Sequence, residues 1–325
     1  MATMKSYSSE WHGLGPFIRE VGNLYRAHSR DIPQRVLSSI EDIRRVQRNV
    51  TEHFCIDVRD ADVLEIGPGQ FLTQLTYLGT LNRAVGIDVD VIVQGFEPLG
   101  YARMLRTNGL VRTGKTIGRK MLGVDRKYAS ELRRVLGLKR LPHVPVYQMD
   151  VCKMSFPTSS FDFVYSRSVL HSLRDPGCAM SEIVRILRPG GVAYLTLHLY
   201  TSETGCLDPR VYSDRRQEVG LWPHLRPQLQ GTFDPPNTFL NKLRLNDWRR
   251  LFAAKMPGAE CILVRSQTPG LEDAAKSLQS QGELLDYSID ELLTGQFAAI
   301  WQKPPVPEKM VEISPTSERL NRVRV

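Results

Sequence analysis

Strand-like and helix-like segments alternate along most of the chain, and this alternation constrains the fold more than any other feature of the sequence. Strand-like segments occur at 63–67, 84–88, 144–149, 161–166, 192–197, 261–266 and 296–304. Between them, 73–81, 178–187 and 245–256 have the spacing of amphipathic helices. The pattern predicts an α/β fold with a seven-stranded, mostly parallel sheet and helices on both faces.

A further amphipathic helix is predicted before the first strand. After Pro33, apolar residues recur every three or four positions, at Val36, Ile40, Ile43, Val46, Val50 and Phe54. We expect this N-terminal helical cover, residues 1–57, to lie over the sheet of a main domain at 58–303. The segment 304–325 is rich in proline and charge and has no periodicity, which predicts a flexible tail.

The segment after the second predicted strand is too long for a simple strand-to-strand connection. We place an insertion at about 97–142, and within 101–140 twelve Lys or Arg stand against only Asp125 and Glu131. Three interpretations remain open: a solvated helical face, a clamp for an anionic substrate group, or a patch for a membrane surface or nucleic acid. We favour the clamp, because only Tyr101 and Tyr128 are available for base stacking.

Composition and cysteine usage restrict the compartment and the chemistry. With 42% hydrophobic and 24% charged residues, the chain has no apolar run near the roughly 20 residues that span a bilayer. The first fifteen residues lack the apolar stretch of a secretory signal, which predicts a cytoplasmic protein. Five scattered cysteines predict reduced thiols and no metal site, and the net charge of +8 favours an anionic partner.

The segment Glu65-Ile-Gly67-Pro-Gly69 joins the first strand to a helix through a glycine turn. Dinucleotide-binding enzymes also have such a turn, but Leu72 stands where their third glycine falls. Glu65 would repel a pyrophosphate, and burying its carboxylate is costly unless a cation or a hydrogen-bond donor faces it. An amino-acid ammonium on a sulfonium cofactor is such a partner.

Two more carboxylates follow neighbouring strands. Asp88 ends the second strand, 21 residues after Gly67, where a carboxylate can accept hydrogen bonds from ribose hydroxyls. Asp150 follows the third strand, where it can lie beside an adenine edge. Because the carboxyl ends of parallel strands meet at one edge of the sheet, these groups predict a single crevice for an adenosyl group without phosphates.

Five motifs together resemble a known family: EIGPG (65–69), GID (86–88), MDV (149–151), FPTSSFDFVYSRSVLHSLRDP (156–176) and SEIVRILRPGG (181–191). Over roughly residues 55–200 the chain resembles the class I, Rossmann-like S-adenosylmethionine-dependent methyltransferases, in their small-molecule, glycan and lipid branch. The resemblance implies that Glu65, Gly67 and Gly69 contact the amino-acid part of the cofactor and Asp88 its ribose. It also implies that Asp150 and Val151 contact the adenine and that Ser166 lines the pocket.

The predicted cofactor-binding set therefore consists of residues at the ends of four strands: Glu65, Gly67, Pro68, Gly69, Asp88, Val89, Asp150, Val151 and Ser166. Phe71 departs from the glycine that many family members have at that position, so the path of the turn is left open.

Transfer to a hydroxyl needs a base near the cofactor. We predict His198 for this role, with His171 as the second candidate, and expect Asp208 to orient the base or bind a hydroxyl. After the fourth strand, Ser166-Arg167-Ser168-Val169 lacks the Asn/Asp-Pro-Pro-aromatic pattern of enzymes that methylate nucleobase amines. The sequence also lacks a cluster of Asp, Asn and His, which predicts a metal-independent reaction.

We expect a cytoplasmic O-methyltransferase for a small molecule or glycan, which could be anionic or lipid-linked. Nucleic acid is disfavoured as a partner, peripheral membrane contact stays open, and the oligomeric state is unknown. Two other functions remain open: an RNA-modifying methyltransferase, and a catalytically silent cofactor-binding module that regulates a partner.

Overall fold

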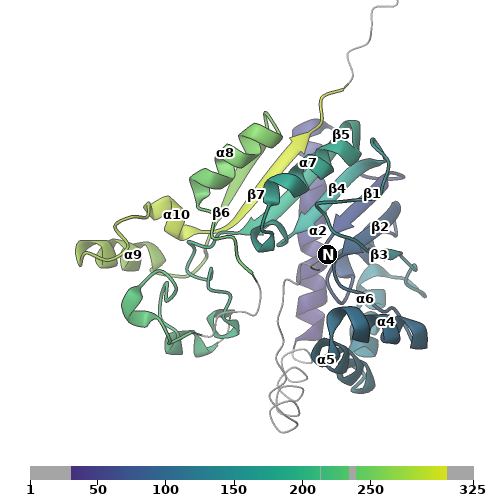
Figure 1. Cartoon of the computed structure of the whole chain (residues 1–325), viewed down its shortest axis with the longest axis horizontal. Helices are drawn as coiled ribbons and strands as arrows, with labels where there is room; N and C mark the ends of the chain where they lie inside the picture. The colour runs from purple at the N-terminus through teal and green to yellow at the C-terminus, as the bar shows by residue number, and fades with distance from the viewer. Residues whose placement is uncertain (1–30, 213, 234–238, 306–325) are drawn as a thin grey trace, which may run out of the picture.

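One seven-stranded sheet forms the centre of the molecule (Figure 1). The structure, a computed structural model, describes residues 31–212, 214–233 and 239–305. The strands are β1 (Asp62–Ile66), β2 (Arg83–Asp88), β3 (Val146–Gln148), β4 (Phe161–Arg167), β5 (Leu187–His198), β6 (Glu260–Arg265) and β7 (Thr294–Gln302). Their order is β3-β2-β1-β4-β5-β7-β6, and β7 runs antiparallel to both of its neighbours. The predicted mostly parallel sheet of seven strands is confirmed.

Helix α2 (Ile32–Phe54) and helix α3 (Thr73–Leu78) cover one face of the sheet. Ile43, Val46 and Val50 of α2 share a hydrophobic cluster with Phe163 of β4 and Tyr194 of β5. The predicted three- and four-residue spacing therefore places the apolar stripe of α2 on the sheet. The N-terminal cover is confirmed for residues 32–54, while 1–30 lie outside the described residues.

Helix α7 (Pro176–Ile186) and helix α8 (Leu245–Lys255) cover the opposite face. Met180 and Ile183 of α7 join Trp248 of α8 in a cluster with Leu64 and Val164 of the sheet. Along β1, Val63 faces the α2 side while Leu64 faces the α7 side, as expected for alternating side chains in a strand covered on both faces.

The predicted insertion after β2 folds as three helices: α4 (Pro98–Asn108), α5 (Leu110–Met121) and α6 (Val124–Leu136). They lie beside one end of α2, at the lower right in Figure 1. Val36 and Ile40 of α2 pack against Val124, Tyr128 and Leu132 of α6. One long helix thus supports both the sheet and the insertion.

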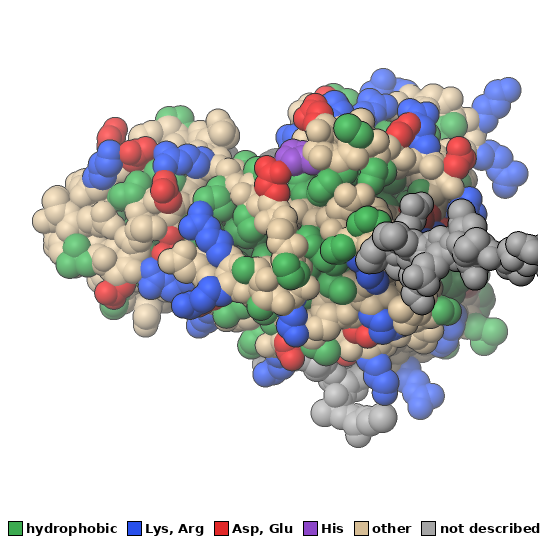
Figure 2. Space-filling view, turned by 90° about the horizontal axis from the view of Figure 1, so that it is seen from above, with side chains coloured by type: hydrophobic (Ala, Val, Ile, Leu, Met, Phe, Trp, Pro, Cys, Tyr) green, Lys and Arg blue, Asp and Glu red, His purple; other side chains and the backbone are tan. Residues whose placement is uncertain are grey.

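A second lobe, which the sequence did not reveal, lies at the far side of β6 (Figure 1). It contains α9 (Leu271–Ser280), α10 (Ile289–Leu293) and short 3-10 turns, η2 (Pro209–Tyr212), η3 (Asp214–Glu218) and η4 (Pro227–Leu229). Trp222 is fully buried against Leu271 and Leu292 in the core of this lobe. Figure 2 shows the lobe beside the larger body, with charged side chains of both signs on each.

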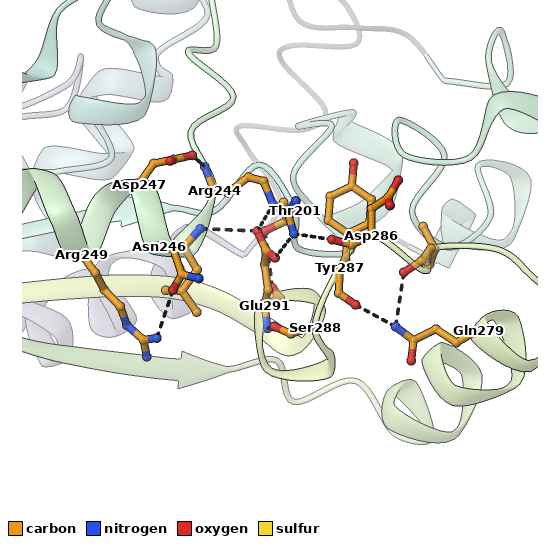
Figure 3. A network of polar contacts seen from close by, with 12 residues as sticks. Thr201, Arg244, Asn246, Asp247, Arg249, Gln279, Asp286, Tyr287, Ser288 and Glu291 are labelled. Atoms are coloured by element: carbon orange, nitrogen blue, oxygen red, sulfur yellow. Dashed lines mark hydrogen bonds and ion pairs between the residues drawn. The ribbon is translucent and has the colours of Figure 1, made fainter.

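An ion pair between a half-exposed arginine and a buried glutamate joins this lobe to α8 (Figure 3). The guanidinium of Arg244, the residue before α8, donates to Glu291 of α10 through Nε at 2.9 Å and through Nη2 at 2.7 Å. The same Nη2 donates to the carbonyl oxygen of Asp286, and the guanidinium lies 4.7 Å from the centre of the Tyr287 ring. Glu291 therefore fixes α10 against the start of α8.

Two sequence predictions concern the ends of the chain and its relation to membranes. The predicted flexible tail is described only at 304–305, and 306–325 lie outside the described residues. Within the described part of the chain, no helix combines the length and the apolar character needed to cross a bilayer.

Candidate active site

The glycine turn after β1 is shaped by backbone angles that favour glycine. Gly67 has φ +69° and Gly69 has φ +68°. A Cβ on Gly67 would lie only 2.4 Å from Cγ2 of Val169, whereas a Cβ on Gly69 would meet no atom within 4 Å. The turn therefore packs tightly against the loop after β4 on one side and leaves an open cradle at Gly69.

Phe71, which departs from the glycine of many similar proteins, packs against the insertion. Its ring stacks on Tyr128 of α6 with 4.2 Å between ring centres, and the Arg119 guanidinium lies 4.7 Å from the Phe71 ring centre. The next residue, Leu72, takes the positive φ of 52°. Leu72, and not Phe71, thus has the left-handed backbone, and the aromatic ring of Phe71 ties the turn to the insertion.

Glu65 is the most unusual ionisable group of the site. Its side chain is 2% exposed, and no described residue bonds to its Oε2 atom. Burial raises the pKa of this carboxyl to about 8, and the nearby Arg167 guanidinium offsets only part of that shift. A buried carboxylate oxygen without a partner fits the ammonium group predicted for the cofactor, because such a cation would satisfy it.

Asp88 lies at the carboxyl end of β2, half-buried. Its Oδ1 accepts a hydrogen bond from the backbone N–H of Asp90 at 2.9 Å, which orients the carboxylate. Burial raises its pKa to about 6. Val89 next to it is exposed, so an apolar side chain is available beside the predicted ribose position. Asp90 forms an ion pair with Arg112 of α5.

The remaining predicted cofactor residues lie at the ends of β3 and β4. Asp150 is exposed and its Oδ1 accepts from the Cys152 N–H at 2.8 Å, while the Val151 side chain is buried in the core. Ser166 of β4 is fully buried and pairs with Ile66 of β1, and its hydroxyl lies 3.5 Å from the carbonyl oxygen of Ile66. The structure therefore places Ser166 inside the sheet, where it supports the turn.

His198 ends β5 and has a defined tautomer. Its Nδ1 lies 3.3 Å from the carbonyl oxygen of Gly295, and because a carbonyl oxygen can only accept, Nδ1 carries the proton. The lone pair of the neutral ring is then on Nε2. Burial lowers the pKa of His198, and the Arg167 guanidinium lowers it further. The ring is therefore neutral at physiological pH.

His171, on the short turn η1 (Leu170–Ser172), has the opposite tautomer. Its Nδ1 accepts the backbone N–H of His198 at 3.3 Å, so the proton of the neutral ring is on Nε2. Burial lowers its pKa to about 3, with a smaller contribution from His198. His171 therefore offers a hydrogen-bond donor where His198 offers an acceptor.

Both histidines line a small pocket at the ends of β4 and β5. Leu199, Leu207, Leu240, Leu243 and Trp248 give it apolar walls, and Tyr200, Asn241 and Lys242 are its other large polar residues. Asn241 Nδ2 donates to the carbonyl oxygens of Leu170 and Leu173, which holds the turn that carries His171. The Nζ of Lys242 lies 5.4 Å from the Tyr200 ring centre.

Arg167 connects the cofactor crevice to this pocket, a role the sequence did not suggest. It ends β4 and forms an ion pair with Asp42 of α2, with 2.9 Å between Nη2 and Oδ2. Its charge acts on the pKa values of both Glu65 and His198. The predicted cofactor acid and the predicted base therefore share one electrostatic neighbourhood.

Asp208 was predicted to assist the base, but the structure places it elsewhere. Both of its carboxylate oxygens bind the Arg210 guanidinium, with 2.6 Å between Oδ2 and Nη2, and its side chain is 1% exposed. Leu207, and not Asp208, lines the pocket. Asp208 was predicted because it is a carboxylate in the loop after β5, and Arg210, two residues later, neutralises it.

The pocket gives no support to the prediction that basic residues of the insertion clamp an anionic group of the substrate. No Lys or Arg of the insertion is among the pocket's described lining residues, and Lys242 is the cation that lines it. Among the described residues, no group of three or more His, Cys, Asp or Glu is arranged to hold a metal ion. Metal independence stays a prediction.

Comparisons with known proteins agree with the site. A family model described as a methyltransferase domain matches residues 100–195. An uncharacterized chloroplastic methyltransferase of Arabidopsis thaliana is 39% identical over 51 residues, which are 16% of this chain and 14% of that relative. The chain thus matches about one seventh of the relative's length.

Two solved structures are similar at low sequence identity. Phosphoethanolamine N-methyltransferase 2 of Haemonchus contortus, in complex with S-adenosyl-L-methionine, is 16% identical, with 80% of this chain and 52% of that chain covered and a TM-score of 0.40. A SAM-dependent methyltransferase of Methanosarcina mazei is 16% identical, with 76% and 94% covered and a TM-score of 0.39.

The domain match includes β3, β4 and β5, and the strand ends before it carry a buried acid with one unpartnered oxygen, an open glycine cradle and the Asp88 carboxylate. Residues 100–195 therefore match a methyltransferase domain, and the Rossmann-like sheet has at its strand ends a site that suits S-adenosylmethionine.

Proposed function

We propose that the chain methylates a hydroxyl group on a small molecule or glycan, with His198 as the general base. The observation that carries this proposal is the tautomer of His198. Its Nδ1 proton is directed at the Gly295 carbonyl, so the basic Nε2 is the nitrogen left to accept a proton in a pocket next to the cofactor crevice.

When bound, S-adenosylmethionine supplies a sulfonium methyl group, and the bond from carbon to sulfur breaks as the acceptor oxygen bonds to that carbon. The protein has to align the acceptor and to remove its proton. His198 Nε2 takes up the hydroxyl proton, and its lowered pKa keeps it unprotonated beforehand. His171 Nε2–H donates a hydrogen bond that helps to orient the acceptor.

The pocket walls favour an acceptor with an apolar body and an anionic group. The five apolar lining residues suit hydrocarbon or the apolar face of a sugar, and Lys242 can pair with a phosphate or carboxylate.

Incubation of the purified protein with methyl-labelled S-adenosylmethionine and fractionated cell extract tests the proposal. We expect label in a small-molecule or glycan fraction, and mass spectrometry with mild alkaline hydrolysis and acid hydrolysis distinguishes ethers, esters and amines. The matched control is His198→Asn, which keeps an N–H donor for Gly295 but has no basic nitrogen.

Label on nitrogen or carbon would refute hydroxyl transfer, and label in an RNA fraction would establish the RNA-modifying alternative instead. Adenosylhomocysteine binding without transfer to any fraction would identify a silent regulatory module. Full activity in His198→Asn would remove His198 as the base.

A further inference from the structure

Helix α5 is amphipathic, but its large apolar side chains face the solvent and not the protein interior. Ile117 follows Leu110 by seven residues, and Met121 follows Ile117 by four. The three side chains therefore form one stripe along the helix. This stripe faces outward, with Leu110 62% and Met121 83% exposed. The buried residues of α5 are instead Val111 and two threonines.

The neighbouring helix α4 and the residues that flank it also carry exposed apolar side chains. Phe96 and Leu99, at its start, are 87% and 82% exposed, and Leu105 and Leu122 are exposed as well. We define the α4–α5 face as Phe96, Leu99, Leu105, Leu110, Ile117, Met121 and Leu122. Of the twelve large hydrophobic residues that are exposed in the described part of the chain, these are seven. Such a concentration marks an interaction surface, because scattered apolar residues are the norm.

Basic side chains are interleaved with this surface. Arg103 and Arg106 follow Leu99 at four and seven positions, so all three lie on the same exposed side of α4. Residues 96–123 contain six Lys or Arg and a single acidic residue, Glu97. Arg126 and Lys127 at the start of α6 are also exposed.

Other cations of the insertion hold its fold together. Arg112 pairs with Asp90, Arg119 with Asp125 at 2.6 Å, and Lys120 donates to the carbonyl oxygens of Val93 and Gly95. The exposed arginines of α4 have a different environment, since they stand among exposed apolar side chains. These arginines are thus placed to meet an anionic surface that also accepts apolar groups.

We propose that the α4–α5 face docks on the surface of a lipid bilayer with anionic headgroups. Acyl chains accept the exposed leucine, isoleucine and methionine side chains, and phosphate-bearing headgroups pair with Arg103 and Arg106. Pairing of two copies through this face would bring their positive charges together. A nucleic acid would use the cations but would leave most of the apolar stripe in water.

Docking would bring the cofactor edge of the sheet near the membrane. Asn108, at the end of α4, donates to the Val91 carbonyl oxygen and accepts from the Val91 N–H, both at 2.9 Å, and Arg112 reaches Asp90. The loop that follows Asp88 is therefore attached directly to the docking helices. This inference does not depend on the proposed hydroxyl transfer, because vesicle binding is measured without an acceptor.

Sedimentation of the full chain with vesicles of pure phosphatidylcholine, and with vesicles containing phosphatidylglycerol, tests this surface. We expect strong partition only with the anionic vesicles, weakening with added salt. Leu110→Ser combined with Met121→Ser should lower the partition coefficient at least about tenfold, because two apolar side chains that would enter the bilayer are lost. Arg103→Gln and Arg106→Gln should each lower it about fivefold.

Matched controls come from the far lobe and α8. Leu285→Ser removes an exposed leucine and Arg249→Gln an exposed arginine, and neither should change vesicle binding. Circular dichroism and adenosylhomocysteine binding show that each variant is folded.

Three results would overturn the proposal. The first is no partition into anionic vesicles, and the second is unchanged partition of the Leu110/Met121 variant. The third is a dimer in solution that the same two substitutions dissociate, because the face would then be a subunit interface.

Discussion

The backbone N–H of His198 donates to Nδ1 of His171 over 3.3 Å, so the two histidines of the pocket have complementary tautomers. His171 is left with a donor at Nε2, and His198, whose Nδ1 faces the Gly295 carbonyl, is left with an acceptor. The contact places the side chain of one histidine against the backbone of the other, at the junction of β5 with the loop after β4.

The two histidines should therefore respond differently to substitution. His198→Asn should lower kcat about 100-fold or more, because a positioned base contributes about 10²–10⁴ to the rate. His171→Asn keeps an oxygen that can accept the His198 N–H, so its effect on kcat should be much smaller. Equal losses in both histidine variants would contradict the assigned roles.

Asp88→Ala should instead weaken cofactor binding, with a lesser effect on kcat.

The pH dependence of turnover follows from the same assignment. His198 must be neutral to accept a proton, and its pKa is lowered from the ordinary 6.5, mainly by burial. At saturating cofactor, the acid limb of the profile of kcat/KM for the acceptor against pH should therefore lie below pH 6.5. An acid limb above pH 6.5, or one that persists in His198→Asn, would point to another base.

Glu65 should make cofactor affinity depend on pH. Without ligand, its pKa is raised to about 8, so the carboxyl is mostly protonated at neutral pH. A bound ammonium favours the carboxylate, so binding below pH 8 releases a proton. Affinity for adenosylhomocysteine should then rise with pH up to about 8, by at most about tenfold per pH unit. Calorimetry in buffers of different ionisation enthalpy measures the released proton, and Glu65→Gln should abolish it.

The two glycines of the turn make a matched pair. Both have positive φ, so either alanine variant costs about 1–2 kcal/mol in backbone strain. Gly67→Ala also forces a Cβ against Val169 and should unfold at a clearly lower temperature than Gly69→Ala. Gly69→Ala should stay folded but bind adenosylhomocysteine more weakly, because its methyl group enters the open cradle. Unchanged binding by Gly69→Ala would mean that the cofactor lies elsewhere.

Stability of the second lobe should depend on Glu291. Its carboxylate is buried and takes two hydrogen bonds from Arg244, so Glu291→Ala should lower the free energy of unfolding by about 2 kcal/mol. Asp290 next to it pairs with Arg265 in an exposed position, and Asp290→Ala should cost less than about 1 kcal/mol. Urea denaturation of both variants tests the difference. Similar losses of unfolding free energy in the two variants would show that the Arg244–Glu291 pair does not hold the second lobe in place.

The sheet was predictable because its signals are local. Each strand is a short apolar run, and the stripe from Val36 to Val50 gives α2 directly. Residues 271–293, by contrast, fold as α9 and α10 around Trp222, which lies 49 or more positions earlier in the chain. That packing is non-local, so no window of the sequence displays it.

The site was predictable where chemistry follows strand ends, as with Glu65, Gly67 and Asp88. It was not predictable where a partner decides the role. From the sequence, Asp208 was expected to orient the base or to bind a hydroxyl, but Arg210 two residues later neutralises its carboxylate. Arg167 looked like an ordinary strand-end cation, and only the fold places its charge within reach of both Glu65 and His198.

Calorimetric titration of the protein with adenosylhomocysteine, and separately with a nicotinamide dinucleotide, tests most directly whether the strand ends hold an adenosyl cofactor without phosphates. We predict saturable adenosylhomocysteine binding at one site per chain, lost in Asp88→Ala, and no binding of the dinucleotide. Saturable uptake of the dinucleotide together with indifference to adenosylhomocysteine would contradict the account.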